Sequence, residues 1–171
     1  MRAWTFLRGD SRDASWPRVS GSAPGAWRLP DEGAPGVTVA VREDLAWWIA
    51  EELWEVEVAG PRVAAGNAVF VRAARLVRRV DRWGPDVWEP FVIRCKHVAL
   101  RAVSGSRWAE ATTDLAARAQ RVGARSAALA GYVTALACAS SAGERDTDGH
   151  RARFAAERAA QSGWIARALD L

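Results

Sequence analysis

Lysine, methionine and tyrosine are nearly absent from this chain of 171 residues. Lys96 is the single lysine among 24 basic residues, and the chain has one methionine, one tyrosine and two cysteines. No stretch approaches the roughly 18 uncharged apolar residues of a membrane span, and the first ten residues lack the apolar core of a signal peptide. We therefore expect a cytoplasmic protein without membrane contact, and two free thiols rather than a disulfide.

Phosphate-binding and nucleophile motifs are missing as well. The sequence contains no G-x-x-x-x-G-K-[ST], no G-x-G-x-x-G after an expected strand and no G-x-S-x-G. These absences argue against a P-loop NTPase, a dinucleotide-dependent oxidoreductase and an α/β-hydrolase. Cys95, His97, Cys138 and His150 have the chemistry of zinc ligands, but their spacing matches no compact zinc module. We expect neither a metal nor another cofactor.

The first half of the chain has the pattern of short strands. Large apolar residues alternate with small or charged ones, most clearly over residues 54–58, where Gly60-Pro61 is expected to end the strand. Residues 9–36 are rich in glycine and proline and predict a long loop, ordered by burial of Trp16 and Trp27. A short helix is expected at 44–53. The other expected strands are residues 2–8, 37–41, 68–71 and 75–81.

The second half changes to helical spacing after Trp83-Gly84-Pro85-Asp86. Apolar residues recur there at three and four positions, the pattern of one face of an amphipathic helix. Strands followed by helices indicate an α+β fold. We expect a small β-rich lobe, residues 1–82, packed on a bundle of about four helices, residues 83–171. The expected helices cover residues 86–104, 107–122, 124–141 and 150–169.

Charge is unevenly distributed along the sequence. Residues 1–60 carry six basic and ten acidic side chains, whereas residues 61–108 carry ten basic and three acidic ones. The basic segment has two interpretations: it attracts an anionic partner such as nucleic acid, or it neutralises the acidic segment packed beside it. Of the two interpretations, we favour internal pairing.

Three residues are candidates for acid/base chemistry. Glu55 and Glu57 alternate with apolar residues and share one side of an expected strand, roughly 7 Å apart. The alternative is a solvated face with Arg72 or Arg75 opposite. His97 stands among Arg94, Lys96 and Arg101, cations that favour a neutral imidazole able to act as a base.

Tryptophan is the most prominent compositional feature, with ten residues. Indoles that meet at the boundary of the two lobes would form a flat-walled pocket for an aromatic ligand, although a core of large side chains is the alternative. Arg72 and Arg79 are candidates for stabilising an anion there. The tryptophans that we assign to the pocket are Trp47, Trp54, Trp83 and Trp88.

Four segments of the chain have a familiar sequence: Arg2 to Leu7, Glu52 to Glu57 followed by Gly60, Arg75 to Val80 before Trp83, and Arg153 to Arg158 continuing to Trp164-Ile165-Ala166. In these segments the chain resembles an uncharacterised family of small actinobacterial proteins. The resemblance implies no established activity. Family members carry a Gly-x-His-Ala-Cys-like segment where this chain reads Gly36-Val37-Thr38-Val39-Ala40, so that the histidine and cysteine are missing.

These observations lead to one functional hypothesis and one alternative. The chain is expected to bind a small hydrophobic or aromatic metabolite in the seam between its lobes. Cofactor-free cyclisation, isomerisation or hydrolysis in bacterial secondary metabolism is conceivable there, with Glu55, Glu57 and His97 as acid/base groups. The alternative is a nucleic-acid-binding or regulatory module that uses the basic segment 72–107. The oligomeric state is not indicated by the sequence.

Overall fold

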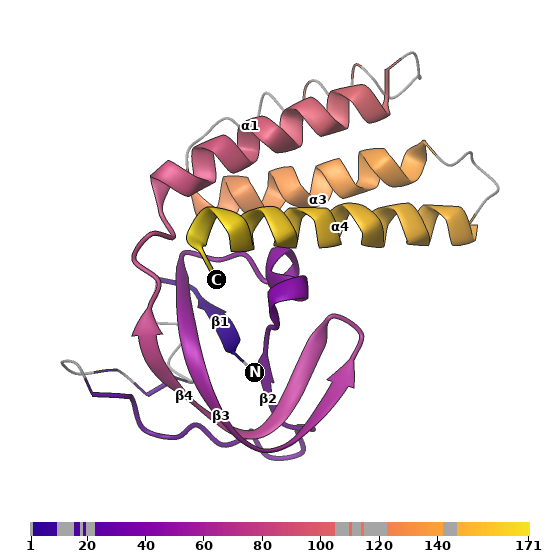
Figure 1. Ribbon diagram of the computed structural model, residues 1–171. Helices are drawn as coiled ribbons and strands as arrows, with labels where there is room; N and C mark the ends of the chain where they lie inside the picture. Colours follow the sequence, from indigo (N-terminus) through magenta and orange to yellow (C-terminus); the bar gives the residue numbers. More distant parts are fainter. Residues whose placement is uncertain are drawn as a thin grey trace.

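The computed structural model confirms the α+β class and places a curled antiparallel sheet beneath a layer of helices (Figure 1). The structure describes residues 2–9, 16, 17, 19, 23–104, 110, 114, 123–141 and 147–171. The expected helix at 107–122 lies outside these residues except for Glu110 and Asp114. The strands are β1 (Ala3–Leu7), β2 (Val37–Val39), β3 (Glu52–Ala65) and β4 (Ala68–Arg79), and the helices are η2 (Arg42–Trp47), α1 (Pro85–Ala102), α3 (Ala124–Ser140) and α4 (Thr147–Leu169).

The sheet has the order β1-β3-β4-β2, and its two outer strands come together at one point. The Trp4 amide donates to the Ala40 carbonyl at 2.9 Å, and the Ala40 amide donates back to Trp4 at 2.8 Å. β1 lies inside the curl formed by the long β3–β4 hairpin (Figure 1). The curl encloses valine, leucine and alanine side chains together with Trp16.

Three predictions for the sheet half are wrong. Residues 68–71 and 75–81, expected as two strands, belong to the single strand β4, Ala68–Arg79. β3 does not end at Gly60-Pro61 but continues to Ala65, because these two residues occupy an irregularity where the register with β4 shifts and Gly60 has φ +82°. The helix predicted over 44–53 is a 3-10 turn, Arg42–Trp47. Glu52 and Leu53 instead belong to β3, where they pair with Leu7 and Phe6.

Part of the long loop is ordered as expected. The Gly25 amide donates to Leu76 at 2.8 Å, and Arg28 exchanges two backbone hydrogen bonds with Ala74. These bonds lay the loop along the edge of β4. Trp16 is 7% exposed and packs inside the curl, whereas Trp27 is 40% exposed.

α3 packs against both α1 and α4, as expected for the central helix of the bundle. Its buried side is lined by small residues such as Ala127, Ala130 and Ala135. The larger Leu129, Tyr132 and Leu136 are exposed. Small residues let the neighbouring helices approach α3 closely, which is why its bulky side chains face outward.

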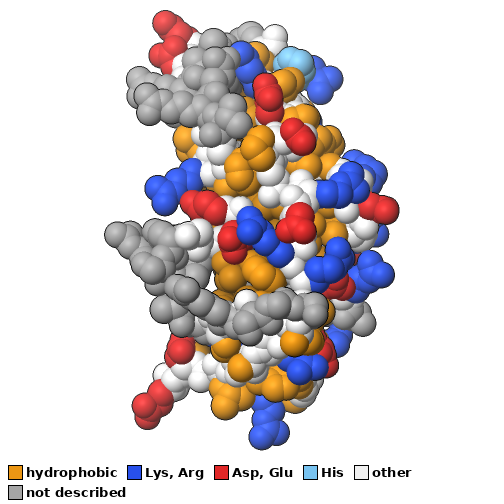
Figure 2. Space-filling view, turned by 90° about the vertical axis from the view of Figure 1, so that its left-hand side faces the viewer, with side chains coloured by type: hydrophobic (Ala, Val, Ile, Leu, Met, Phe, Trp, Pro, Cys, Tyr) orange, Lys and Arg blue, Asp and Glu red, His pale blue; other side chains and the backbone are white. Residues whose placement is uncertain are grey.

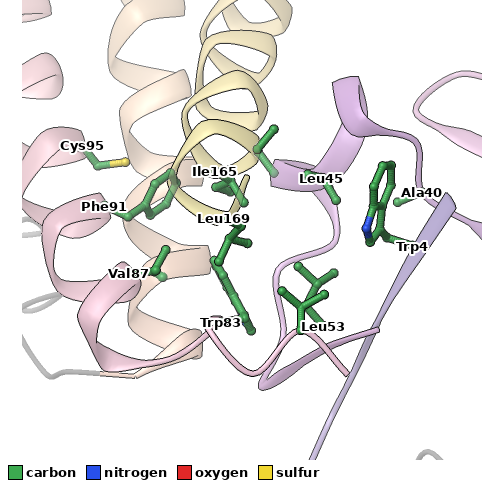
Figure 3. Packing of buried hydrophobic residues seen from close by; sticks show 14 of the residues in the cluster. Trp4, Ala40, Leu45, Leu53, Trp83, Val87, Phe91, Cys95, Ile165 and Leu169 are labelled. Atoms are coloured by element: carbon green, nitrogen blue, oxygen red, sulfur yellow. The ribbon is translucent and has the colours of Figure 1, made fainter. Parts of the chain in front are cut away.

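One hydrophobic cluster fills the space between the sheet and the helices (Figure 3). Phe91 and Ile165, from α1 and α4, are fully buried, as is Leu53 from β3. Each such side chain contributes about 1.5–3 kcal/mol when it leaves water. The sheet and the helices therefore share this core, in addition to the smaller cluster that the curl of the sheet encloses.

A second connection between the two halves is polar. We call Arg94, Glu157, Arg158, Gln161 and Ser162 the polar cluster; the last four lie on α4 and are buried. The Ala46 amide donates to Ser162 Oγ at 3.0 Å, and the Arg158 guanidinium donates to the Ala46 carbonyl. Gln161 Nε2 donates to the Gly131 carbonyl of α3 at 2.9 Å. The cluster thereby joins η2, α3 and α4.

We predict that Gly131→Ala destabilises the protein. A Cβ at this position would lie 2.9 Å from Gln161 Oε1 and 3.0 Å from an Arg158 nitrogen, so the polar cluster must shift. We expect the free energy of unfolding in urea to fall by about 1–3 kcal/mol. Gly163→Ala is the control, because its Cβ would lie 3.4 Å from the flexible end of Arg167, and alanine is the better helix former. If both substitutions changed the free energy of unfolding equally, the close packing of the polar cluster against Gly131 would be contradicted.

Candidate functional site

Glu55 and Glu57 share one face of β3, as the alternation predicts, and each has an arginine opposite it. Glu55 pairs in register with Arg78, and Glu57 with Arg75. The Arg78–Glu55 contact is 3.1 Å, and the Arg75–Glu57 contact is 2.7 Å. The two carboxylates thus belong to cross-strand ion pairs, the arrangement that the sequence offered as the alternative to catalysis.

Trp83 and Trp88 lie at the boundary of the two halves, where they are part of the packed core. Trp83 is 4% exposed and donates its indole N–H to the Ala50 carbonyl at 2.8 Å. Its ring meets Phe6 at 5.3 Å and Trp88 at 6.0 Å, both edge to face. These contacts fill the boundary with aromatic rings at this point.

Trp47 and Trp54 occupy two other environments. Trp47 packs against Phe154 of α4, with a ring separation of 5.5 Å, and lies under the Arg158 guanidinium. Trp54 donates its indole N–H to Glu52 at 3.0 Å. The four tryptophans that the sequence assigned to one pocket are therefore distributed over separate contacts.

The remaining predicted site residues line two different grooves or lie on the surface. Arg79 and Glu55 line a groove of about 430 Å³ between the sheet and the end of α4, together with Arg2 and other arginines. His97 lines a groove of about 820 Å³ along α1, beside Arg94 and Trp164. Arg72 is exposed. His97 is thus not brought together with Glu55 and Glu57.

The basic segment is extensively paired with acidic side chains. Besides the pairs of Glu55 and Glu57, Arg79 lies 3.5 Å from Glu52 and 3.9 Å from Asp81. Acidic and basic side chains are intermixed on the face shown in Figure 2. This arrangement fits the internal-pairing interpretation of the sequence, since a nucleic-acid surface requires a patch of one sign.

A third hollow lies between β1 and β2, beside the bridge from Trp4 to Ala40. We call it the β1–β2 pocket; its volume is about 200 Å³. Three aromatic residues and three polar ones are among those that line it. The lining residues are Thr5, Phe6, Leu7, Trp16, Arg28, Thr38, Val39, Ala40 and Trp48.

Each aromatic wall of the β1–β2 pocket is held by a specific part of the fold. Trp16 packs into the interior of the curled sheet. Trp48 follows η2 and donates its indole N–H at 2.9 Å to the carbonyl of Asn67, in the turn between β3 and β4. Phe6 lies on β1 and is fixed from behind by Trp83. A pocket with walls fixed in this way is formed without a ligand.

Sequence reasoning did not find the β1–β2 pocket. It identified Trp16 as a buried anchor of the loop, and it placed the ligand with Trp47 rather than its neighbour Trp48. The pocket depends on the approach of β1 to β2, two strands that are joined directly at Trp4 and Ala40 but are remote in sequence. The sequence would have had to indicate that β1 pairs with the end of β2 before the pocket could be predicted.

Both cysteines are free, and neither has the environment of a nucleophile. Burial raises the pKa of the Cys95 thiol to about 11, despite the opposing effect of Arg94. Burial also raises the pKa of Cys138, which is only partly buried. A reactive cysteine needs a lowered pKa. Among the described residues, no group of three or more His, Cys, Asp or Glu side chains is placed to hold a metal ion.

Comparison with known proteins adds no further evidence: no family model, curated protein or solved structure matches the chain. None of the described helices combines the length and the apolar character that crossing a membrane requires.

We predict that Cys95 lowers stability at alkaline pH. Its thiol stays protonated up to about pH 11 in the folded protein but ionises near pH 9 when unfolded, so the unfolded state gains stability between these values. Urea unfolding of Cys95→Ala should therefore lose less stability between pH 9 and pH 11 than the native chain does. Cys138→Ala is the comparison: its thiol is only partly buried, so we expect its pH profile to differ from that of the native chain less than the Cys95→Ala profile does. Parallel pH profiles of the native chain and Cys95→Ala would contradict the prediction.

Proposed function

We propose that this protein binds a small planar aromatic molecule in the β1–β2 pocket. The observation that carries the proposal is the convergence of Phe6, Trp16 and Trp48 on one hollow of about 200 Å³. Offset or edge-to-face contacts with such rings favour a flat aromatic ligand. A cavity of about 150 Å³ already holds benzene in another protein, so one substituted ring matches this volume.

The polar groups in the β1–β2 pocket give a ligand its orientation. Thr5 of β1 and Thr38 of β2 are among its lining residues, and a threonine hydroxyl can donate or accept a hydrogen bond. Small-molecule sites combine apolar walls with a few polar groups in this way. Among the residues that the structure describes, those that line the pocket include no carboxylate, imidazole or thiol. We therefore propose binding rather than acid/base catalysis for this pocket.

The proposed ligand is of the aromatic class inferred from the sequence, but its binding site is the β1–β2 pocket instead of the seam between the two halves. The seam at Trp83 and Trp88 is filled by their own rings, whereas the pocket opens between β1 and β2. The ion pairs of Glu55 and Glu57 support neither the acid/base reaction nor a basic surface for nucleic acid. We make no second functional proposal.

We expect 4-fluorobenzyl alcohol, a neutral aromatic probe, to bind with a Kd below about 1 mM. The binding free energy per non-hydrogen atom that this Kd requires is one that very small ligands reach. Fluorine NMR line broadening measures this affinity. Thr38→Phe places a ring in the pocket and should weaken binding at least about ten-fold, because the probe loses its space. Trp48→Ala, which removes a wall, should also weaken it.

Val63→Phe is the matched control, because it adds a ring to β3 at an exposed position outside the pocket. Circular dichroism and urea unfolding check that each variant is folded. The proposal is rejected if the native chain does not broaden the probe signal at millimolar concentration, or if Thr38→Phe binds the probe as the native chain does.

A further inference from the structure

We infer that Arg28 makes the β1–β2 pocket selective for a monocyclic aromatic carboxylate of about the size of benzoate. This inference rests on the proposed function, because it specifies the charge of the ligand in the same pocket. It starts from the position of Arg28, whose backbone is fixed to β4. Its amide donates to the Ala74 carbonyl at 2.7 Å, and its carbonyl accepts from the Ala74 amide at 3.1 Å.

The guanidinium of Arg28 is largely removed from water but has weak anionic compensation. Its side chain is 20% exposed and lies over Trp16, 5.2 Å from the ring centre. Its ion-pair partner among the described residues is Asp31, at 3.5 Å, and the Asp31 side chain is 81% exposed. An exposed partner at this distance replaces little of the hydration that the guanidinium has lost.

Arg75, in the same sheet, is an arginine whose charge is compensated by a close carboxylate, and it serves as the comparison for Arg28. It too lies over an indole, 4.7 Å from the centre of Trp27, but it binds Glu57 at 2.7 Å through a register neighbour. Arg75 lies outside the β1–β2 pocket, whereas Arg28 lines it. Of these two arginines, the one with the weaker carboxylate partner among the described residues is therefore the one that lines the aromatic hollow.

A carboxylate attached to an aromatic ring matches both the aromatic lining of the pocket and the positive charge of Arg28. Its two oxygens can accept parallel hydrogen bonds from the planar guanidinium, and such charge-assisted pairs are stronger where water is excluded. The ring would lie among Phe6, Trp16 and Trp48, and the hydroxyls of Thr5 and Thr38 line the same hollow. The volume of about 200 Å³ limits the ligand to a single ring.

The test compares 4-fluorobenzoate with 4-fluorobenzyl alcohol, which has the same ring without the charge. We expect the native chain to bind the benzoate at least about ten-fold more tightly. Arg28→Gln keeps hydrogen-bond donors but removes the charge, so it should abolish this preference, measured as the ratio of the two affinities in the same variant. Arg75→Gln, the matched control, should retain the preference.

Asp31→Asn provides a second measurement that leaves Arg28 in place. Because it removes the competing carboxylate, it should increase the affinity for 4-fluorobenzoate, by about two- to five-fold, the effect of an exposed ion pair. The inference is overturned if the native chain binds both probes equally, if Arg28→Gln retains the preference, or if Asp31→Asn weakens benzoate binding. Displacement of the benzoate by equimolar inorganic phosphate would also overturn it. Failure of the alcohol to bind rejects the proposed function itself.

Discussion

The backbone of Ala46 is the point on which the arrangement of the sheet and the helices depends. Its amide and its carbonyl are both taken up by α4, through Ser162 and Arg158, within a buried environment. Backbone groups of a short turn would otherwise lose their hydration without replacement. Because Leu45 beside them is fully buried in the common core, the polar and apolar contacts fix η2 together. η2 in turn determines where the chain enters β3.

The β1–β2 pocket follows from this constraint. η2 connects Ala40, which closes the curl against Trp4, to Trp48, which forms one wall of the pocket. Arg158 lies over Trp47 while Trp48 reaches the turn of the β3–β4 hairpin. Two adjacent indoles are thus directed to opposite sides of η2, one to the helices and one to the sheet. None of the described residues of the helical half lines the pocket, but this half positions one of its walls.

The sequence predicted the regular parts of the fold because their local periodicity agrees with their final environment. The alternation at Glu55 and Glu57 and the helical spacing around Phe91 are such cases. It misassigned residues 44–53, where Leu45 and Trp48 have helical spacing but β1 recruits Glu52 and Leu53. It also grouped the tryptophans by their proximity in sequence. Their distribution in space depends on long-range strand pairing, for which the sequence has no local signal.

Arg158 and Ser162 reach residue 46 across more than one hundred residues of chain. During synthesis the sheet is complete well before α4 leaves the ribosome, so its exposed edge and the apolar side of η2 have no native cover in that interval. Loop closure over such a separation is slow relative to local pairing of β3 with β4. A chain that ends before residue 158 lacks both contacts to the Ala46 backbone and leaves the apolar side of η2 without its native cover.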